Sequence, residues 1–430
     1  RGEATLVSHD VPEPWAGWYR DEGVDLVEPG GVVAADVGLV DGYPLELADL
    51  GPLGNGPRVR IDDHGLSPRE PVDLLLDQTA GADPGLYPHA GRVLVGPRYV
   101  LLRRSLVALA QTRASGGPET GRGDPDGPVD LLVVRGGAPT PEVVEFFDAV
   151  LSHLDPAGWR VRLLTGGQDP GEAMASADLA LSAAGSTSWE LSLLGVPAVL
   201  VAVAENQEPV GRGVGAAGAA RYLGPHHELD PVAVAGALVE LAADPASCAD
   251  LARGGRALVD GQGAARVATR VRSLLVRIRR AQDGDAERIH RWNDDPLVRA
   301  ASFQPDPIPW GDHTRWFADR LADPATPIYV ATDAAGGDLG VVRFDGRGDD
   351  TIVSVALAAE RRGQGWGGAV IDAGFRAHGG DRPATDEVVA VVRAGNDASR
   401  RAFIDADFDL RPDGAPGTLR YARVHGTDRR

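Results

Sequence analysis

The sequence predicts an α/β protein in which two domains with parallel, doubly wound sheets precede a third domain of the α+β class. Three observations lead to this prediction. Short apolar runs alternate with amphipathic helical stretches before residue 271, as in βαβ units. A stretch rich in Gly, Pro and charge at residues 111–128 interrupts that alternation and is expected to be a linker. After residue 271 the composition changes and the expected strands are in part antiparallel.

The expected elements follow the chain in order. In the first domain, mostly buried parallel strands are expected at residues 4–8, 37–41, 58–61, 72–76 and 92–95. In the second domain, strands are expected at residues 129–134, 160–164, 179–182 and 198–203, with a helix from Pro141. In the third domain, strands are expected at residues 273–280, 329–332, 339–344, 351–357 and 388–393, with a helix at 287–292. The expected domains are 1–112, 128–272 and 274–424, separable by a cut within 269–273.

Composition excludes several classes of function. The 430 residues carry a formal net charge of −19, which argues against binding to nucleic acid or to an anionic membrane. One cysteine, Cys248, rules out an internal disulfide framework and any metal site built from several cysteines. The sequence contains no lysine, so Schiff-base, Walker A and kinase lysines are absent. No apolar run reaches the ~20 residues that cross a bilayer, and a cytoplasmic protein is the simplest expectation.

A small-residue turn in the second domain has the composition of an anion site. Residues 182–207 read SAAGSTSWELSLLGVPAVLVAVAENQ, so a strand ends in Ala-Ala-Gly and a helix follows at once. Backbone N–H groups and hydroxyls at a helix N-terminus suit a diphosphate. Glu190, one turn into the helix, is placed to accept both ribose hydroxyls. The alternative is that the small residues only permit tight packing of helix on strand. A second glycine turn, Gly136-Gly137, follows the strand at 129–134.

This segment resembles a known family. Together with blocks at 41–43, 61–63, 73–78, 96–103 and 260–267, it is similar to UDP-2,4-diacetamido-2,4,6-trideoxy-β-L-altropyranose hydrolase, the PseG-type enzyme of pseudaminic acid synthesis. The resemblance covers about residues 1–272 and implies two Rossmann-like domains of the GT-B fold. It implies that water attacks the anomeric carbon of a UDP-sugar and expels UDP. The implied substrate-binding residues are Gly136, Gly137, Gly185, Ser186, Thr187, Ser188, Glu190 and Gln207, with Tyr43 and Asn206 as catalytic residues near the sugar.

The chain departs from that family at its start. The family opens with a strand and a GxGHxxR loop whose His is the expected base, whereas this sequence begins at what corresponds to the second strand. We therefore expect a first domain that lacks its initial strand, and a hydrolase half that binds UDP-sugar better than it hydrolyses it. The family's GGSDP turn stands here as GGAPT, from Gly136 to Thr140, without the acid.

The third domain contains a second phosphate-binding pattern. Residues 361–367 read RRGQGWG, between the strand at 351–357 and an apolar helix at 369–377. Closely spaced glycines let a backbone approach a pyrophosphate, and the helix N-terminus supplies N–H donors. Arg362 is expected to add positive charge. The alternative is a glycine-rich turn without a ligand.

Four further segments give this pattern a family context. Residues 393–403 and 405–408 follow about 30 residues later, and the set resembles GNAT N-acetyltransferases. Residues 292–299 and 312–317 resemble the PseH-type subgroup, which acetylates UDP-4-amino sugars in the same pathway. The resemblance implies acetyl-CoA as acyl donor and needs no metal. The implied cofactor-binding residues are Val355, Leu357, Arg362, Gly363, Gln364, Gly365, Trp366, Gly367, Asn396, Ser399 and Phe403.

Direct acetyl transfer needs positioning, an oxyanion donor and a base for the substrate ammonium. The strand at 351–357 is expected to splay from its neighbour and to donate backbone N–H groups to the thioester carbonyl. His313 and Glu360 are the candidate bases and Ser354 a polar helper, although Glu360 also fits a solvated position and His313 a pocket wall. Phe403 stands where many relatives carry a Tyr that protonates the departing thiolate, and a phenyl ring donates no proton.

The first hypothesis is therefore a bifunctional enzyme of pseudaminic (nonulosonic) acid synthesis. It would acetylate a UDP-4-amino-6-deoxy sugar and then release UDP from the diacetamido product. Its partners would be that UDP-amino sugar, with no nucleic acid and no membrane. Two alternatives stay open: a GT-B glycosyltransferase with an accessory acetyltransferase, or a UDP-sugar-binding half without catalytic activity attached to an active acetyltransferase.

Overall fold

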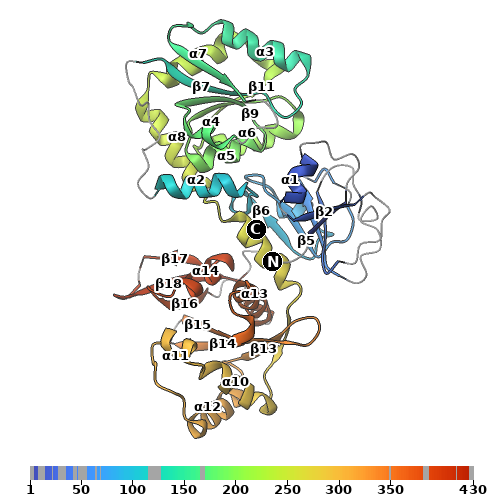
Figure 1. Cartoon of the computed structure of the whole chain (residues 1–430), viewed down its shortest axis with the longest axis vertical. Helices are drawn as coiled ribbons and strands as arrows, with labels where there is room; N and C mark the ends of the chain where they lie inside the picture. Colours follow the sequence, from blue (N-terminus) through green and yellow to red (C-terminus); the bar gives the residue numbers. More distant parts are fainter. Residues whose placement is uncertain are drawn as a thin grey trace.

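The fold consists of a β1–β2 pair, two parallel sheets and one mixed sheet, as seen in a computed structural model (Figure 1). Figure 1 places the five-stranded sheet and the seven-stranded sheet at opposite ends of the molecule, with the four-stranded sheet between them. The structure describes residues 4–7, 15–21, 23–27, 35–41, 46, 56–62, 65–67, 69–114, 127–164, 170–347, 350–380, 387–412 and 414–425. Most of the expected linker, residues 115–126, lies outside this part.

The first unit contains two separate parallel sheets. β1 (Ala4–Val7) and β2 (Val24–Val27) pair with each other, and α1 (Trp15–Asp21) joins them. The other four strands form one sheet in chain order: β3 (Gly38–Asp41), β4 (Arg58–Asp62), β5 (Leu74–Asp77) and β6 (Val93–Val95). The apolar Leu74–Leu76 run makes β5 the buried centre, as the sequence predicts. The strand expected at residues 4–8 exists but pairs outside this sheet.

The second unit is a five-stranded parallel sheet in the order β11-β10-β9-β7-β8. Its strands are β7 (Val129–Val134), β8 (Trp159–Leu163), β9 (Leu179–Ala183), β10 (Ala198–Ala202) and β11 (Arg221–Pro225). Its helices are α3 (Pro141–Ser152), α4 (Gly171–Ala175), α5 (Thr187–Leu194), α6 (Glu208–Ala216), α7 (Pro231–Ala242) and α8 (Pro245–Leu258). Counted within the unit, the order is 2-1-3-4-5, a doubly wound topology whose direction reverses between β7 and β9.

The third unit is a seven-stranded mixed sheet in the order β12-β13-β14-β15-β16-β18-β17. Its strands are β12 (Arg277–Arg280), β13 (Ile328–Thr332), β14 (Asp338–Arg347), β15 (Asp350–Leu357), β16 (Glu387–Arg393), β17 (Asp409–Arg411) and β18 (Thr418–Val424). Its helices are α10 (Ala286–Asn293), α11 (Pro296–Ala301), α12 (Trp310–Ala322), α13 (Trp366–Gly379) and α14 (Asp397–Asp405). Core side chains of α13 pack against the inner face of β13–β16.

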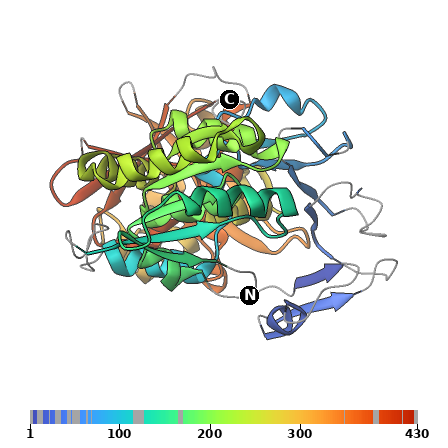
Figure 2. The ribbon, with the colours of Figure 1, turned by 90° about the horizontal axis from the view of Figure 1, so that it is seen from above.

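Two helices connect the units by packing across their boundaries. α2 (Arg104–Ala114) follows the first unit in the chain, but its Leu106 lies in the core of the second unit. α9 (Gly263–Ser273) follows the second unit, yet Val267 packs in the core of the four-stranded sheet. A Cβ on Gly263 would lie 2.2 Å from the Val100 carbonyl oxygen, so glycine lets α9 approach that sheet closely. The chain therefore crosses between the first two units twice. Figure 2, viewed from above, shows β1, β2 and α1 in dark blue at one side of the molecule.

Candidate functional site

The predicted phosphate loop of the third unit forms a tight turn in front of α13. Gly363 and Gly365 have φ of 71° and 79°, in the left-handed region that favours glycine. Gly365 caps α13, and Gly363, Gln364 and Gly365 are exposed. The turn thus presents the backbone N–H groups at the start of a 14-residue helix to solvent. This arrangement suits an anionic group such as a pyrophosphate.

A gap opens beside this loop because β15 and β16 diverge after their first paired residues. Their parallel register covers two residue pairs, Thr351–Val388 and Ile352–Val389. By contrast, β15 pairs with β14 along its whole length. The N–H of Ala358 donates to the Leu339 carbonyl of β14, so by strand alternation the backbone N–H groups of Val355 and Leu357 face the gap. The predicted splay of this strand from its neighbour is confirmed by this register. Binding of a thioester carbonyl by these two N–H groups stays a prediction.

The Arg362 guanidinium forms hydrogen bonds to other groups of the protein. Its Nη1 donates to Asp295 Oδ1 over 2.7 Å, and its Nε and Nη2 donate to the Leu357 carbonyl over 3.2 and 3.0 Å. Asp295 also caps α11 by accepting from the N–H groups of Leu297 and Val298. The hydrogen bond from Arg362 lowers the pKa of Asp295 below its usual value. Arg362 therefore links β15 to α11, and its charge is paired with Asp295 rather than directed at the loop.

A different arginine reaches the loop from outside the third unit. Arg272 of α9 donates from Nη1 to the Gln364 carbonyl over 2.7 Å. Its guanidinium also lies over the Trp366 ring, 5.3 Å from the ring centroid. The Gln364 side chain turns back and donates from Nε2 to the Glu360 carbonyl over 2.7 Å. No local sequence motif contains Arg272, because it lies in a separate helix 92 residues before Gln364.

The residues expected to bind cofactor from α14 have local structural roles. Asn396 caps α14, with Oδ1 accepting from the Ser399 N–H over 3.1 Å. Phe403 is 4% exposed and packs edge-on against Phe408 at 5.2 Å between ring centroids. Gly367 faces α14, since a Cβ there would lie 3.1 Å from Ala402 Cβ. The Phe403 side chain thus belongs to the core, and contact of α14 with a cofactor stays a prediction.

The three candidate catalytic residues of the third unit differ in surroundings. His313 is 2% exposed, and its Nε2 lies 2.9 Å from the Ala286 carbonyl, which fixes that nitrogen as the protonated one. Its ring stacks on Phe317, and burial lowers its pKa. Glu360 is exposed beside the loop, and Ser354 is half-buried on β15. Their positions suit Glu360 to proton exchange with solvent and His313 to a pocket wall.

The second unit brings its two glycine turns to one edge of the sheet. Gly136 follows β7 with φ of 93°, and Gly185 follows β9. These two strands flank the point where the sheet order reverses, and ligands of open α/β sheets bind outside the carboxyl ends of such strands. A Cβ on Gly136 or on Gly137 would meet no atom within 4 Å, so this turn is open.

The turn after β9 leaves polar groups without partners. The Ser186 side chain makes no capping hydrogen bond to α5, which starts at Thr187. Within the described part of the chain, the buried Ser188 hydroxyl has no hydrogen-bond partner. Glu190 is buried one turn into α5, and its Oε1 lies 3.4 Å from Arg103 Nε. An unsatisfied buried hydroxyl requires an explanation, and a bound ligand is one.

Gln207 lies beside the same turn. Its Oε1 accepts from the Val203 N–H over 3.0 Å, and its Nε2 lies 3.6 Å from the position of a Cβ on Gly185. Asn206 is exposed in the short turn that follows β10. Gly185 and Gln207, distant in sequence, are therefore brought together. Tyr43 lies outside the described residues.

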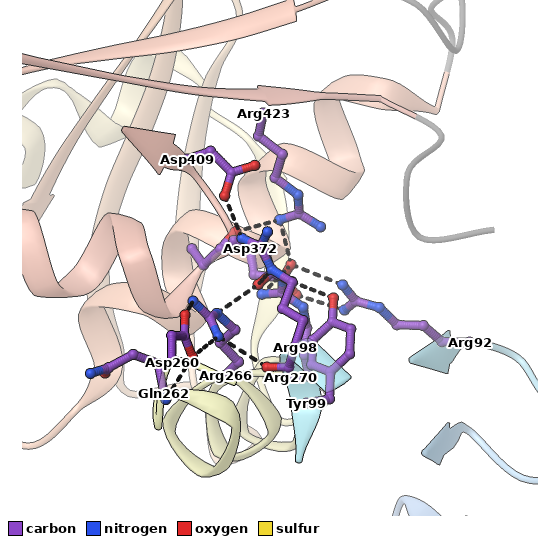
Figure 3. Close-up of polar contacts among 12 residues, drawn as sticks. Arg92, Arg98, Tyr99, Asp260, Gln262, Arg266, Arg270, Asp372, Asp409 and Arg423 are labelled. Atoms are coloured by element: carbon purple, nitrogen blue, oxygen red, sulfur yellow. Dashed lines mark hydrogen bonds and ion pairs between the residues drawn. The ribbon is translucent and has the colours of Figure 1, made fainter. Parts of the chain in front are cut away.

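A buried ion-pair cluster links α9 to the first and third units (Figure 3). Its centre is two aspartates of the third unit, Asp372 in α13 and Asp407 after α14. Burial raises the pKa of Asp407, but the charges of Arg270 and Arg98 outweigh it and bring the pKa to about 2. Burial also raises the pKa of Asp372, but the neighbouring arginines, Arg270 above all, hold it well below its usual value. The arginines around them are Arg92, Arg98, Arg266, Arg270 and Arg423.

Neither a metal cluster nor a single spanning helix is found where the chain is described. No group of three or more His, Cys, Asp or Glu there is arranged to hold a metal ion. No single helix of that part is long and apolar enough to cross a membrane. One bent pair of helical segments, Pro231–Ala242 and Pro245–Ser273, is together long and apolar enough to cross a membrane by length and composition only. The two segments meet at an angle of 94°.

Comparison with known proteins identifies the third unit. Residues 276–409 match the family model described as "Acetyltransferase (GNAT) domain". Spermidine N-acetyltransferase from Vibrio cholerae in complex with CoA and spermine shares 15% identity, over 36% of this chain and 98% of that chain, with a TM-score of 0.32. The dodecameric structure of the same organism's enzyme in an intermediate state shares 15% identity over 35% of this chain and 94% of that chain, with a TM-score of 0.30. No curated protein gives a significant match.

The family match assigns the C-terminal part of the chain. Residues 276–409 are a GNAT acetyltransferase domain, in agreement with the sequence-based prediction for that part. Enzymes of this class use acetyl-CoA, and the N-terminus of α13 and the gap beside β15 are the predicted places of its pyrophosphate and its thioester arm. The match ends at residue 409 and starts at 276, so α9 lies outside it.

Proposed function

We propose that the chain acetylates the amino group of a UDP-4-amino-6-deoxy sugar and then releases UDP from the acetylated product by hydrolysis. The observation that carries the acetyl-transfer step is the parting of β15 from β16 directly ahead of the left-handed Gly363–Gly365 turn. The sugar-nucleotide part is supported by the resemblance of residues 1–272 and by the two glycine turns at the reversal point of the second sheet.

In the proposed acetyl transfer, acetyl-CoA supplies a thioester-activated acetyl group. The N–H groups of Val355 and Leu357 hold the carbonyl oxygen as it gains negative charge. The substrate ammonium first loses a proton. Glu360 accepts it, directly or through water, because Glu360 is exposed whereas His313 is buried. The amine nitrogen then forms a bond to the carbonyl carbon and gives up its second proton to water, the carbon–sulfur bond breaks, and the thiolate leaves. Water protonates it, since Phe403 has no acidic proton and lies in the core.

The sugar nucleotide is proposed to bind the second unit. The diphosphate would sit at the turns of Gly136 and Gly185, where Ser186 and Ser188 have hydroxyls free of protein partners in the described structure. Glu190 would give up its ion pair with Arg103 and accept hydrogen bonds from the ribose hydroxyls instead. The exchange of helices α2 and α9 between the first two units supports the GT-B arrangement proposed for them.

A panel of acceptors tests the acetyl-transfer proposal. The full chain is incubated with acetyl-CoA and one of three amines: the UDP-4-amino-6-deoxy sugar, the same amino sugar without UDP, and spermidine. Release of free CoA is measured as kcat/KM. The proposal predicts a clear preference for the UDP-linked sugar, because the nucleotide contributes binding that the other amines lack. A preference for spermidine, or equal rates for the sugar with and without UDP, would overturn it.

Release of UDP tests the second step. The diacetamido UDP-sugar is supplied without acetyl-CoA, with and without an added sugar acceptor, and free UDP is measured. Release that needs no acceptor supports hydrolysis. Release only with an acceptor would indicate a glycosyltransferase, and binding without release would indicate a binding half.

A further inference from the structure

Helix α9 packs directly on the first turn of α13, the helix that starts at the acetyl-CoA loop. A Cβ on Gly368 would lie 3.0 Å from Thr269 Cγ2 and 3.2 Å from the Ala402 carbonyl oxygen. Glycine at this position therefore lets α9 and α14 approach α13 closely. Arg270 fixes the contact through its ion pair with Asp372, 3.0 Å from Nη1 to Oδ1, in which neither side chain is exposed. α9 is thus held rigidly beside the loop.

This contact places the Arg272 guanidinium at the N-terminal end of α13. Its Nη1 lies 2.7 Å from the Gln364 carbonyl oxygen and 2.2 Å from the position of a Cβ on Gly365. Within the described residues, that is the one hydrogen bond of the Arg272 side chain, and no carboxylate lies within ion-pair distance. An arginine has five N–H donors, so several remain for a ligand.

The location is electrostatically unfavourable without an anion. The N-terminus of a helix carries partial positive charge, so a cation there is destabilising. Arg362, the arginine of the loop motif, does not resolve this, because its charge is paired with Asp295 at 2.7 Å. An anionic ligand between the loop N–H groups and Arg272 would convert the repulsion into attraction.

We propose that Arg272 binds the pyrophosphate of acetyl-CoA, so that the upstream helix α9 completes the acyl-donor site of the GNAT domain. This inference rests on the acetyl-CoA site of the proposed function but not on the identity of the amine. Residues 276–409 supply the backbone donors at Gly363–Gly365, and α9 supplies the charge. The donor site is therefore composite, and the acetyltransferase domain depends on the first two units for acetyl-CoA affinity.

Calorimetric binding of CoA to the full-length chain tests this inference. Four proteins are compared: the unaltered chain, Arg272→Ala, Arg272→Gln and Arg253→Ala. Gln at 272 keeps a donor for the Gln364 carbonyl but has no charge, so it separates phosphate binding from loop positioning. Arg253 is a surface arginine of α8, 68% exposed, and its removal matches the charge change. Thermal unfolding of each variant confirms that it is folded.

The inference predicts that Arg272→Ala and Arg272→Gln both weaken CoA binding by about tenfold or more, the effect of losing a charged hydrogen bond. Both variants should also show a shallower dependence of affinity on salt concentration, and Arg253→Ala should bind as the unaltered chain does. Unchanged affinity in Arg272→Ala, or near-normal affinity in Arg272→Gln, would overturn direct phosphate binding. If the unaltered chain bound no CoA, the acetyl-CoA site of the proposed function would fall, and this inference with it.

Discussion

Arg270 of α9 and Asp372 of α13 form an ion pair in which both side chains are fully buried, with 3.0 Å between Nη1 and Oδ1. Asp372 also accepts from Arg92 of the first unit over 2.7 and 3.1 Å and from Arg423 of β18 over 2.9 Å. One carboxylate thus joins the first unit, α9 and the GNAT domain. That a cut within residues 269–273 separates independent domains stays a prediction, and this cluster opposes it, because Arg270 lies within that segment.

Replacement of Asp372 by Asn should destabilise the whole chain. The change leaves the buried guanidinium of Arg270 with less compensating charge, and loss of one partner of a buried pair costs about 3–5 kcal/mol. Chemical denaturation measures the free energy of unfolding. Asp409→Asn is the control, because Asp409 is 52% exposed and pairs with a partly exposed Arg98. A similar small effect for both variants would mean that the buried cluster contributes little.

The cluster should also make stability depend on pH in the acid range. The pKa of Asp407 is about 2 in the folded protein against 3.8 ordinarily, so its contribution is complete above pH 4 and is lost as the pH falls towards 2. The lost contribution is ~2 kcal/mol. The difference in unfolding free energy between the unaltered chain and Asp407→Asn should therefore shrink from pH 6 to pH 2. A difference that stays constant with pH would contradict the lowered pKa.

A fragment that starts at residue 276 should be less stable than the same domain in the full chain. It keeps Asp372 and Asp407 but loses Arg92, Arg98, Arg266 and Arg270, which lie upstream. The face of α13 that α9 covers in the full chain would also become exposed. Thermal unfolding of the fragment and of the full chain measures the effect, and a fragment as stable as the full chain would show that the cluster is dispensable.

Gly365→Asp should weaken acetyl-CoA binding strongly. The new carboxylate would lie beside the pyrophosphate, and a residue with a side chain is strained at φ of 79°. Gly336→Asp is the matched control, because Gly336 lies in an exposed turn with a φ of 86° and a Cβ there meets no atom within 4 Å. Calorimetry with acetyl-CoA is the measurement, and unchanged affinity in Gly365→Asp would remove the loop from the acyl-donor site.

Glu190→Ala should weaken binding of UDP to the second unit by about 1–3 kcal/mol, the effect of losing a hydrogen-bonded group. Glu240→Ala is the control, because Glu240 is an exposed carboxylate of the same unit, paired with Arg221 at the surface. Protection by UDP against thermal unfolding provides the readout. Equal protection of Glu190→Ala and the unaltered chain would exclude Glu190 from the nucleotide site.

Local patterns were sufficient to predict much of the third unit and of its loop. The glycine spacing at 363–367 is set by backbone geometry within a few residues, and the strand before it was found to within one residue. Arg272 was missed because its contact with Gln364 spans 92 residues of sequence. A lone carboxylate in an apolar helix, as at Asp372, indicates a buried ion pair. Its partners Arg92 and Arg270 could not be predicted, because they lie in other units of the chain.

The central claim is that acetylation occurs on the amine while UDP is still attached to the sugar. The direct measurement is mass spectrometry of a time course with ¹³C-labelled acetyl-CoA, the UDP-4-amino-6-deoxy sugar and the full chain. The account predicts that a UDP-sugar carrying one labelled acetyl group appears first, and that free UDP appears only after it. Label found only on sugar without UDP, or UDP released at the same rate when acetyl-CoA is omitted, would contradict it.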